Sequence, residues 1–104
     1  LLGHLHKLAR ASGLTARVDA AAVPYLEGAR AALTAGFVSG GTRRNLAWVR
    51  PHLRASGVTE DDLLLLADAQ TSGGLLLAGE LPGHPVIREL LPAAGDGVTL
   101  VVRG

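Results

Sequence analysis

Apolar residues recur along the chain with two periods, one typical of helices and one typical of strands. In residues 1–10, leucine and alanine fall on one helical face, while His6, Lys7 and Arg10 fall largely on the other, which predicts an amphipathic helix. Gly13 can end this helix in a left-handed conformation. Further helices are predicted over 25–35, 43–53, 60–67 and 86–91, and strands over 14–20, 73–78 and 98–102.

Residues that cap or break helices support several of these boundaries. Pro24 suits the first turn of the helix over 25–35, and Thr42 can cap the helix over 43–53, which Pro51 should bend or end early. Thr59 and Asp62 have the spacing of a capping box in which a carboxylate replaces the usual Glu or Gln. Because helices alternate with a few strands, the sequence predicts one α/β domain over 1–104, with a sheet covered by helices.

Composition restricts the core and the class of protein. Of 104 residues, 48% are hydrophobic, but the aromatic ones are limited to Tyr25, Phe37 and Trp48, so leucine, valine and alanine must build the core. The absence of cysteine excludes disulfides and thiolate metal sites. A net charge of +1 gives no reason to expect nucleic acid, and the longest apolar run, 63–67, is too short to span a membrane. We interpret the chain, which begins at Leu1, as part of a longer cytoplasmic protein.

A short polar segment, TSGG at 71–74, separates the apolar runs 63–67 and 75–78. It offers two hydroxyl groups, unhindered backbone N–H groups and the backbone freedom of glycine. Successive N–H groups of this kind form a positive concavity that can hold a phosphate. On the residues alone, a glycine-rich start to a buried strand is the favoured interpretation.

Three blocks of sequence together resemble a known family. They are LLGHL (1–5), GGTRRN (40–45) and DAQTSGGLL (68–76), with VDAAAVP (18–24) between the first two. Their order and spacing are similar to those of the C-terminal domain of selenophosphate synthetase (selenide, water dikinase). This domain belongs to the aminoimidazole ribonucleotide synthetase-like superfamily, which implies a mixed β-sheet covered by helices, here incomplete on its N-terminal side. The resemblance covers nearly all of 1–78. Ala69 stands where the family usually has proline, and the tail after Gly79 is shorter than usual.

The resemblance implies a function for the parent protein. Such enzymes make selenophosphate from selenide and ATP and release AMP and phosphate, with Mg and ATP as cofactors. The family's N-terminal ATP-binding domain carries the glycine-rich segment, the catalytic cysteine or selenocysteine with its partner lysine, and several aspartates, and none of that region lies in this sequence. We therefore expect no catalytic residue, metal ligand or cofactor in this chain. It should be an inactive scaffold whose partners are that N-terminal domain and, in the parent, a second copy in a homodimer.

Six residues are candidates for a position near the inter-domain cleft and its phosphate. They are Thr71, Ser72, Gly73, Gly74, Arg44 and Asn45. Guanidinium groups beside the free N–H groups of a helix start can bind phosphate in a bidentate manner. The alternative, favoured by the residues alone, is that Arg44 and Asn45 lock a loop by binding carbonyl groups. Asp68 is expected to cap the start of the turn through its own carboxylate.

The remaining polar clusters are better explained by structural roles. His4 and His6 are two positions apart and so point in different directions from a helix, which disfavours a metal site. The acidic run 60–62 is expected to stabilise the positive end of the helix that it starts.

Two other classes of function remain open. One is a different ATP-dependent enzyme of the same superfamily, acting on a purine or thiamine precursor. The other is a non-catalytic interaction or oligomerisation module that associates through unpaired sheet edges.

Overall fold

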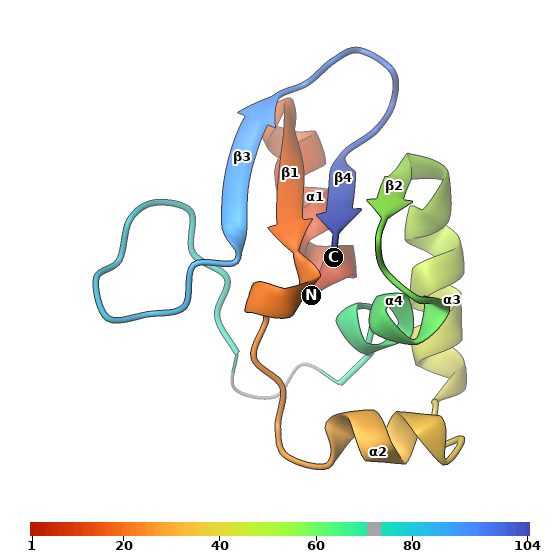
Figure 1. The fold of residues 1–104 in the computed structure, drawn as a ribbon. Coiled ribbons are helices and arrows are strands. Elements are labelled where there is room, and N and C mark those ends of the chain that lie inside the picture. The colour runs from red at the N-terminus through yellow and green to blue at the C-terminus, as the bar shows by residue number, and fades with distance from the viewer. Residues whose placement is uncertain (71–73) are drawn as a thin grey trace.

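The fold is a four-stranded mixed sheet with helices packed on one face (Figure 1). The computed structural model describes residues 1–70 and 74–104. The strands are β1 (Leu14–Asp19), β2 (Leu53–Ser56), β3 (Arg88–Pro92) and β4 (Leu100–Arg103), in the order β2-β4-β1-β3. Strand β4 runs parallel to both β1 and β2, and β3 pairs antiparallel with β1. The predicted α/β fold with a mixed sheet is confirmed.

In the described residues, four α-helices and two short 3₁₀ turns precede or connect these strands. They are α1 (Leu2–Ser12), η1 (Ala20–Ala22), α2 (Ala29–Thr34), α3 (Gly40–Val49), η2 (Arg50–His52) and α4 (Glu60–Leu66). Helix α1 lies behind the sheet and packs on β1, β4 and α3, while α4 packs between α2 and α3 (Figure 1). No helix in the described part of the chain is long and apolar enough to cross a membrane.

The core lies between α1 and the two central strands, and it is made of aliphatic side chains as predicted. Ala16 and Val18 of β1 lie beside Leu100 and Val102 of β4, and these four side chains are almost completely buried. The helices cover them with Leu2, Leu5 and Ala9 of α1, Leu46 and Val49 of α3, and Leu63, Leu64 and Leu66 of α4. Burial of this much aliphatic surface is the main force that holds the helices on the sheet.

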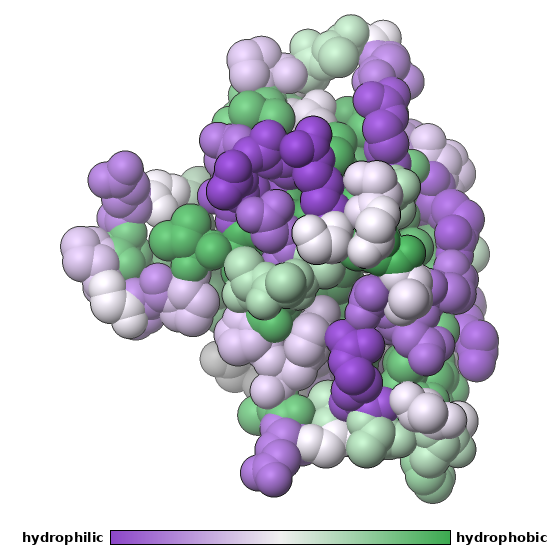
Figure 2. Space-filling model, in the orientation of Figure 1, coloured by the Kyte–Doolittle hydropathy of each residue, from purple (hydrophilic) through white to green (hydrophobic). Residues whose placement is uncertain are grey.

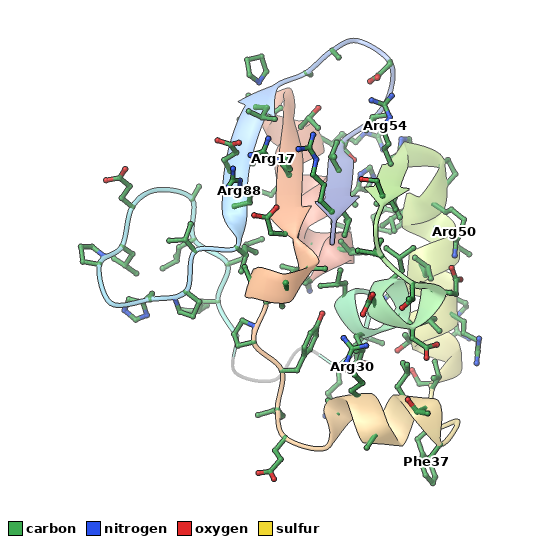
Figure 3. The ribbon with its side chains drawn as sticks, in the orientation of Figure 1. Arg17, Arg30, Phe37, Arg50, Arg54 and Arg88 are labelled. Carbon is green, nitrogen blue, oxygen red and sulfur yellow. The ribbon has the colours of Figure 1, made fainter. Side chains whose placement is uncertain are left out.

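The opposite face of the sheet is polar. Figure 2 views the molecule from this side and shows hydrophilic side chains over the strands. Arg17 of β1 binds Glu89 of β3 at 2.5 Å, and Arg54 of β2 binds Asp96 at 3.1 Å (Figure 3). The sheet therefore buries alternate residues in the core on one face, while Arg17 and Arg54 form ion pairs on the other.

Local capping signals correctly predicted the end of α1 and the start of α4. Gly13 adopts φ 65° after α1, and its N–H donates to the carbonyl groups of the preceding turn. At α4 the Thr59 hydroxyl accepts from the Asp62 N–H at 3.1 Å, and the Asp62 carboxylate accepts from the Thr59 N–H at 2.9 Å. These bonds, followed by the ion pair with Arg30, lower the pKa of Asp62 below its usual value. The predicted capping box is confirmed.

The second and third helices differ from their predicted bounds. The helix predicted over 25–35 is shortened to α2, because Gly28, just before it, has φ 84° and breaks the helical path. Helix α3 begins at Gly40 instead of residue 43, since Ser39, and not Thr42, is its N-cap. Pro51 ends this helix early, as expected, and the chain passes through η2 into β2, a strand that was not predicted.

Two predictions in the last third of the chain are wrong. Residues 74–78 form no strand, and Leu75 and Leu77 are 89% and 60% exposed, while Gly73 lies outside the described residues. The helix predicted over 86–91 is replaced by β3, which pairs with β1 along its length. A short apolar segment has little helical preference of its own, so the free edge of β1 decides its conformation.

Candidate functional site

The blocks 40–45 and 68–70, far apart in sequence, meet at the N-terminal end of α3. The side chain of Thr42 joins them and is only 3% exposed. Its hydroxyl donates to Asp68 Oδ1 at 3.0 Å and accepts from the Ala69 N–H at 3.2 Å. Ser39 Oγ, the N-cap of the helix, lies 3.0 Å from the same hydroxyl. One buried oxygen thus fixes the chain that leaves α4 against the start of α3.

Asn45 adds a second connection one turn further along α3. Its side-chain amide donates to the carbonyl oxygen of Ala67 at 3.2 Å, just beyond the end of α4. The last carbonyl groups of a helix have no partner within the helix, so this bond satisfies one that would otherwise need water. Asn45 therefore does lock a loop through a carbonyl group, and its contact with a ligand stays a prediction.

Glycine at the start of α3 allows the two segments to come close. A Cβ atom on Gly41 would lie 3.1 Å from the Cβ of Ala69, tighter than ordinary van der Waals contact. A Cβ on Gly40 would instead meet Arg44 Nη1 at 3.1 Å, so the exposed Arg44 guanidinium lies over the first turn of its own helix. Gly41 is thus needed for backbone packing, whereas only a flexible side-chain end opposes Gly40.

This difference predicts unequal effects of two similar substitutions. Gly41→Ala should destabilise the chain by about 1 kcal/mol relative to Gly40→Ala, because overpacking forces the 68–70 segment to shift. Gly40→Ala should be neutral or slightly stabilising, since alanine favours the helix and Arg44 can move aside. Urea unfolding of both variants measures the difference. Equal stabilities would show that the contact with Ala69 imposes no constraint.

Asp68 has the capping role expected for it. Besides the bond to Thr42, its Oδ1 accepts the Gln70 N–H at 3.4 Å, which is the pattern of an Asx turn. Its carboxylate also lies at the N-terminal end of α3, where the helix dipole and free N–H groups favour negative charge. The end of α3 is therefore an environment that suits an anion, and Asp68 supplies one.

The predicted turn itself is only partly described. Thr71, Ser72 and Gly73 lie outside the described residues. Gly74 is exposed, and a Cβ atom there would meet nothing within 4 Å. The structure therefore brings Asn45 to the 67–70 segment, which directly precedes the predicted phosphate cradle in the chain. It places the Arg44 guanidinium over the start of α3.

Two of the three acidic residues at the start of α4 are engaged in the fold. Asp62 completes the capping box, and Glu60 binds Arg50 at 2.5 Å (Figure 3). In residues 1–70 and 74–104, no group of three or more His, Asp or Glu side chains is placed to hold a metal ion.

A shallow depression lies between α3 and α4. Its volume is about 130 Å³, and it is lined by Arg43, Leu46, Ala47, Arg50, Glu60 and Leu64. Pockets that enclose small molecules usually measure roughly 300–1,000 Å³. This depression is too small to enclose a nucleotide.

Sequence reasoning missed two features of this region. The first is the connecting role of Thr42, although Ser39 three positions earlier is a usable N-cap signal. The second is a cluster of His6, Trp48 and His52 near the other end of α3, which no short motif indicates because the residues are far apart in sequence. The expected place of His6 on the polar face of the first helix is wrong, because its ring is buried against these two residues.

Comparisons with known proteins agree with the resemblance. No protein-family model matches the chain. It is 45% identical over 96 residues to the selenide, water dikinase of Bordetella bronchiseptica, covering 92% of this chain and 26% of that protein. The enzymes of the same name from Porphyromonas gingivalis and Pseudomonas aeruginosa are 49% and 51% identical over 78 residues, or 75% of this chain and 22% of each relative. The chain thus spans about a quarter of the length of the curated relatives that it matches.

Proposed function

We propose that this chain is a scaffold segment of a selenophosphate synthetase. The chain belongs to the selenide, water dikinase family and spans about a quarter of the length of the relatives that it matches. It would form part of the C-terminal domain of that enzyme and one wall of the cleft between domains. The parent would make selenophosphate from selenide and ATP in the cytoplasm, with release of AMP and phosphate. Its N-terminal domain would bind Mg and ATP, and its active form would be a homodimer.

The observation that carries this proposal is the bond network around Thr42. Two bonds of the Thr42 hydroxyl, which itself lies 3.0 Å from Ser39 Oγ, hold residues 68 and 69 at the N-terminal end of α3, so the segment that follows starts beside a helix end that favours negative charge. Backbone N–H groups of the turn 71–74 would then face a phosphate of the nucleotide or product. Arg44, exposed over the same helix end, would add positive charge.

The described residues do not fit a magnesium site. Mg²⁺ takes oxygen ligands in an octahedral arrangement, usually one or two carboxylates with water and phosphate oxygens. Asp62 and Glu60 are engaged by α4 and Arg50, and Asp68 is bound by Thr42 and Gln70. Because phosphoryl transfer from ATP depends on such metal ligands and a phosphate cradle, the machinery would come from the rest of the parent.

We therefore expect the 104-residue chain to show no measurable affinity for Mg-ATP and no dikinase activity. Isothermal titration calorimetry with Mg-ATP is the test, with the intact parent under the same conditions as the positive control. The parent should release or absorb heat in a saturable manner, while the chain alone should match the dilution blank. Saturable, metal-dependent binding by the chain would overturn its assignment as scaffold.

A further inference from the structure

A buried titratable side chain lies outside the site described above. His6 of α1 is 1% exposed, and its Nδ1 lies 2.5 Å from the hydroxyl of Thr99, just before β4. The other ring nitrogen, Nε2, is buried and has no hydrogen-bond partner among the described residues. A neutral imidazole can leave one bare nitrogen in an apolar environment at modest cost, but a buried N–H that carries positive charge needs an acceptor.

A second histidine is stacked on the first. The ring centroids of His6 and His52 are 4.7 Å apart and their planes differ by 21°. The Nδ1 of His52 donates to the carbonyl oxygen of Gly97 at 3.0 Å, and this bond holds the ring in place. Trp48 of α3 closes the cluster with an edge contact to His6 at 4.9 Å. The charged form of His6 would thus face a second imidazole.

The other charges around His6 do not compensate for a proton on it. Arg10, one turn along α1, is also cationic, and Lys7 lies over the ring of Trp48 at 5.7 Å. The one acid in residues 93–99, Asp96, binds Arg54 and the Val98 N–H. Burial first, and then His52 and Arg10, lower the pKa of His6 below its ordinary value.

Thr99 is the point through which this cluster reaches the sheet. Its N–H donates to the carbonyl oxygen of His52 at 3.0 Å, and its carbonyl oxygen accepts from the Ala16 N–H at 2.7 Å. Thr99 therefore places the start of β4 between β1 and β2, while its hydroxyl ties that start to α1 through His6. A change at His6 therefore acts on β4, one of the two central strands.

We propose that His6 and His52 form a pH-sensitive latch that holds the start of β4 against α1 while His6 is neutral and releases it when His6 takes up a proton. The direction of the pH dependence follows from the two states of the latch. In the closed state the start of β4 is held against α1, and in the open state it is released. With its folded pKa lowered, His6 binds protons more readily in the open state than in the closed one. The closed state is therefore fully favoured above about pH 6.5, the ordinary histidine value, and loses stability as the pH falls below it.

Amide hydrogen exchange of the chain between pH 7.5 and pH 5 tests the latch, after correction for intrinsic exchange rates. The protection of the Ala16 and Thr99 amides should fall by up to about tenfold per pH unit below pH 6.5. The Leu63 amide, in the first turn of α4, should change less. The single tryptophan, Trp48, gives a second signal, because a protonated histidine against an indole quenches its fluorescence. Equal changes at all three amides, or none, would overturn the proposal.

Two variants and a control assign the effect to this pair. His6→Phe keeps a ring of similar shape but cannot titrate, so the pH dependence at Thr99 should disappear. His84→Gln, at an exposed position, should leave it unchanged. Should His6→Phe not fold, His52→Gln removes one repulsion and should raise the pH at which the His6 ring titrates by NMR. Titration of His6 at its ordinary value in the unmodified chain would by itself reject the latch.

Discussion

Replacing Gly73 and Gly74 together with valine in the intact parent enzyme is expected to lower kcat/KM for selenophosphate formation by about 100-fold. Valine restricts the backbone and places branched side chains where a phosphate would approach the N–H groups of the turn. A displacement of about 1 Å at a reacting centre is enough for a loss of this size. Steady-state assays of AMP release with selenide and ATP measure the effect.

A matched double substitution in the same part of the chain controls for general damage. Gly79 and Gly83 are also exposed, and a Cβ atom at either position would meet nothing within 4 Å. Valine at both positions strains the backbone, because both glycines have positive φ. This control should retain most of the activity. If both double variants lose activity equally, the turn 71–74 has no special place in the cleft.

Thr42→Val is expected to destabilise the chain by about 2 kcal/mol and to lower the parent's kcat/KM by about tenfold. Valine has nearly the same shape as threonine, but it leaves the Asp68 carboxylate and the Ala69 N–H without their shared partner. Loss of one partner from such a pair typically costs about 1–3 kcal/mol. Urea unfolding of the chain gives the first number, and assays of the parent at a temperature where it is folded give the second.

Thr34→Val is the matched control for this substitution. The Thr34 hydroxyl is exposed and donates to the carbonyl oxygen of Arg30 within its own helix. Its removal should change stability by about 0.5 kcal/mol or less, as is usual for surface positions. A Thr42→Val variant that is as stable and as active as Thr34→Val would show that the network does not position the turn.

The elements that sequence reasoning found correctly are those whose signals are local. Helix α1 has a clear apolar face and ends at Gly13, and α4 begins at a complete capping box. Both signals lie within a few residues and do not depend on the rest of the chain. The same is true of the early end of α3 at Pro51.

The elements that were missed depend on partners distant in sequence. Strand β2 has four residues, three of them exposed, so no alternation marks it, and it forms because β4 provides a parallel neighbour. Strand β3 overlaps the segment where a helix was predicted over 86–91, yet pairing with β1 and the ion pair from Arg17 to Glu89 fix it as an edge strand. Periodicity contains no information on such pairing.

The candidate site shows the same limit. The residues alone identified TSGG and the GGTRRN block as unusual, and the resemblance placed both near one cleft. Neither showed that Thr42 would leave the N-cap position to Ser39 and bind Asp68 instead. That arrangement depends on the close approach of Ala69 to Gly41, which is a property of the packed chain.

Phosphorus NMR of the reaction of the parent protein and of this chain, each with selenide, Mg and ATP, tests the central claim most directly. The account predicts that the parent forms selenophosphate, AMP and phosphate only when selenide is present, and that the chain alone leaves ATP unchanged. ATP consumption by the parent that depends on a purine or thiamine precursor and not on selenide would contradict the account, as would any turnover by the chain alone.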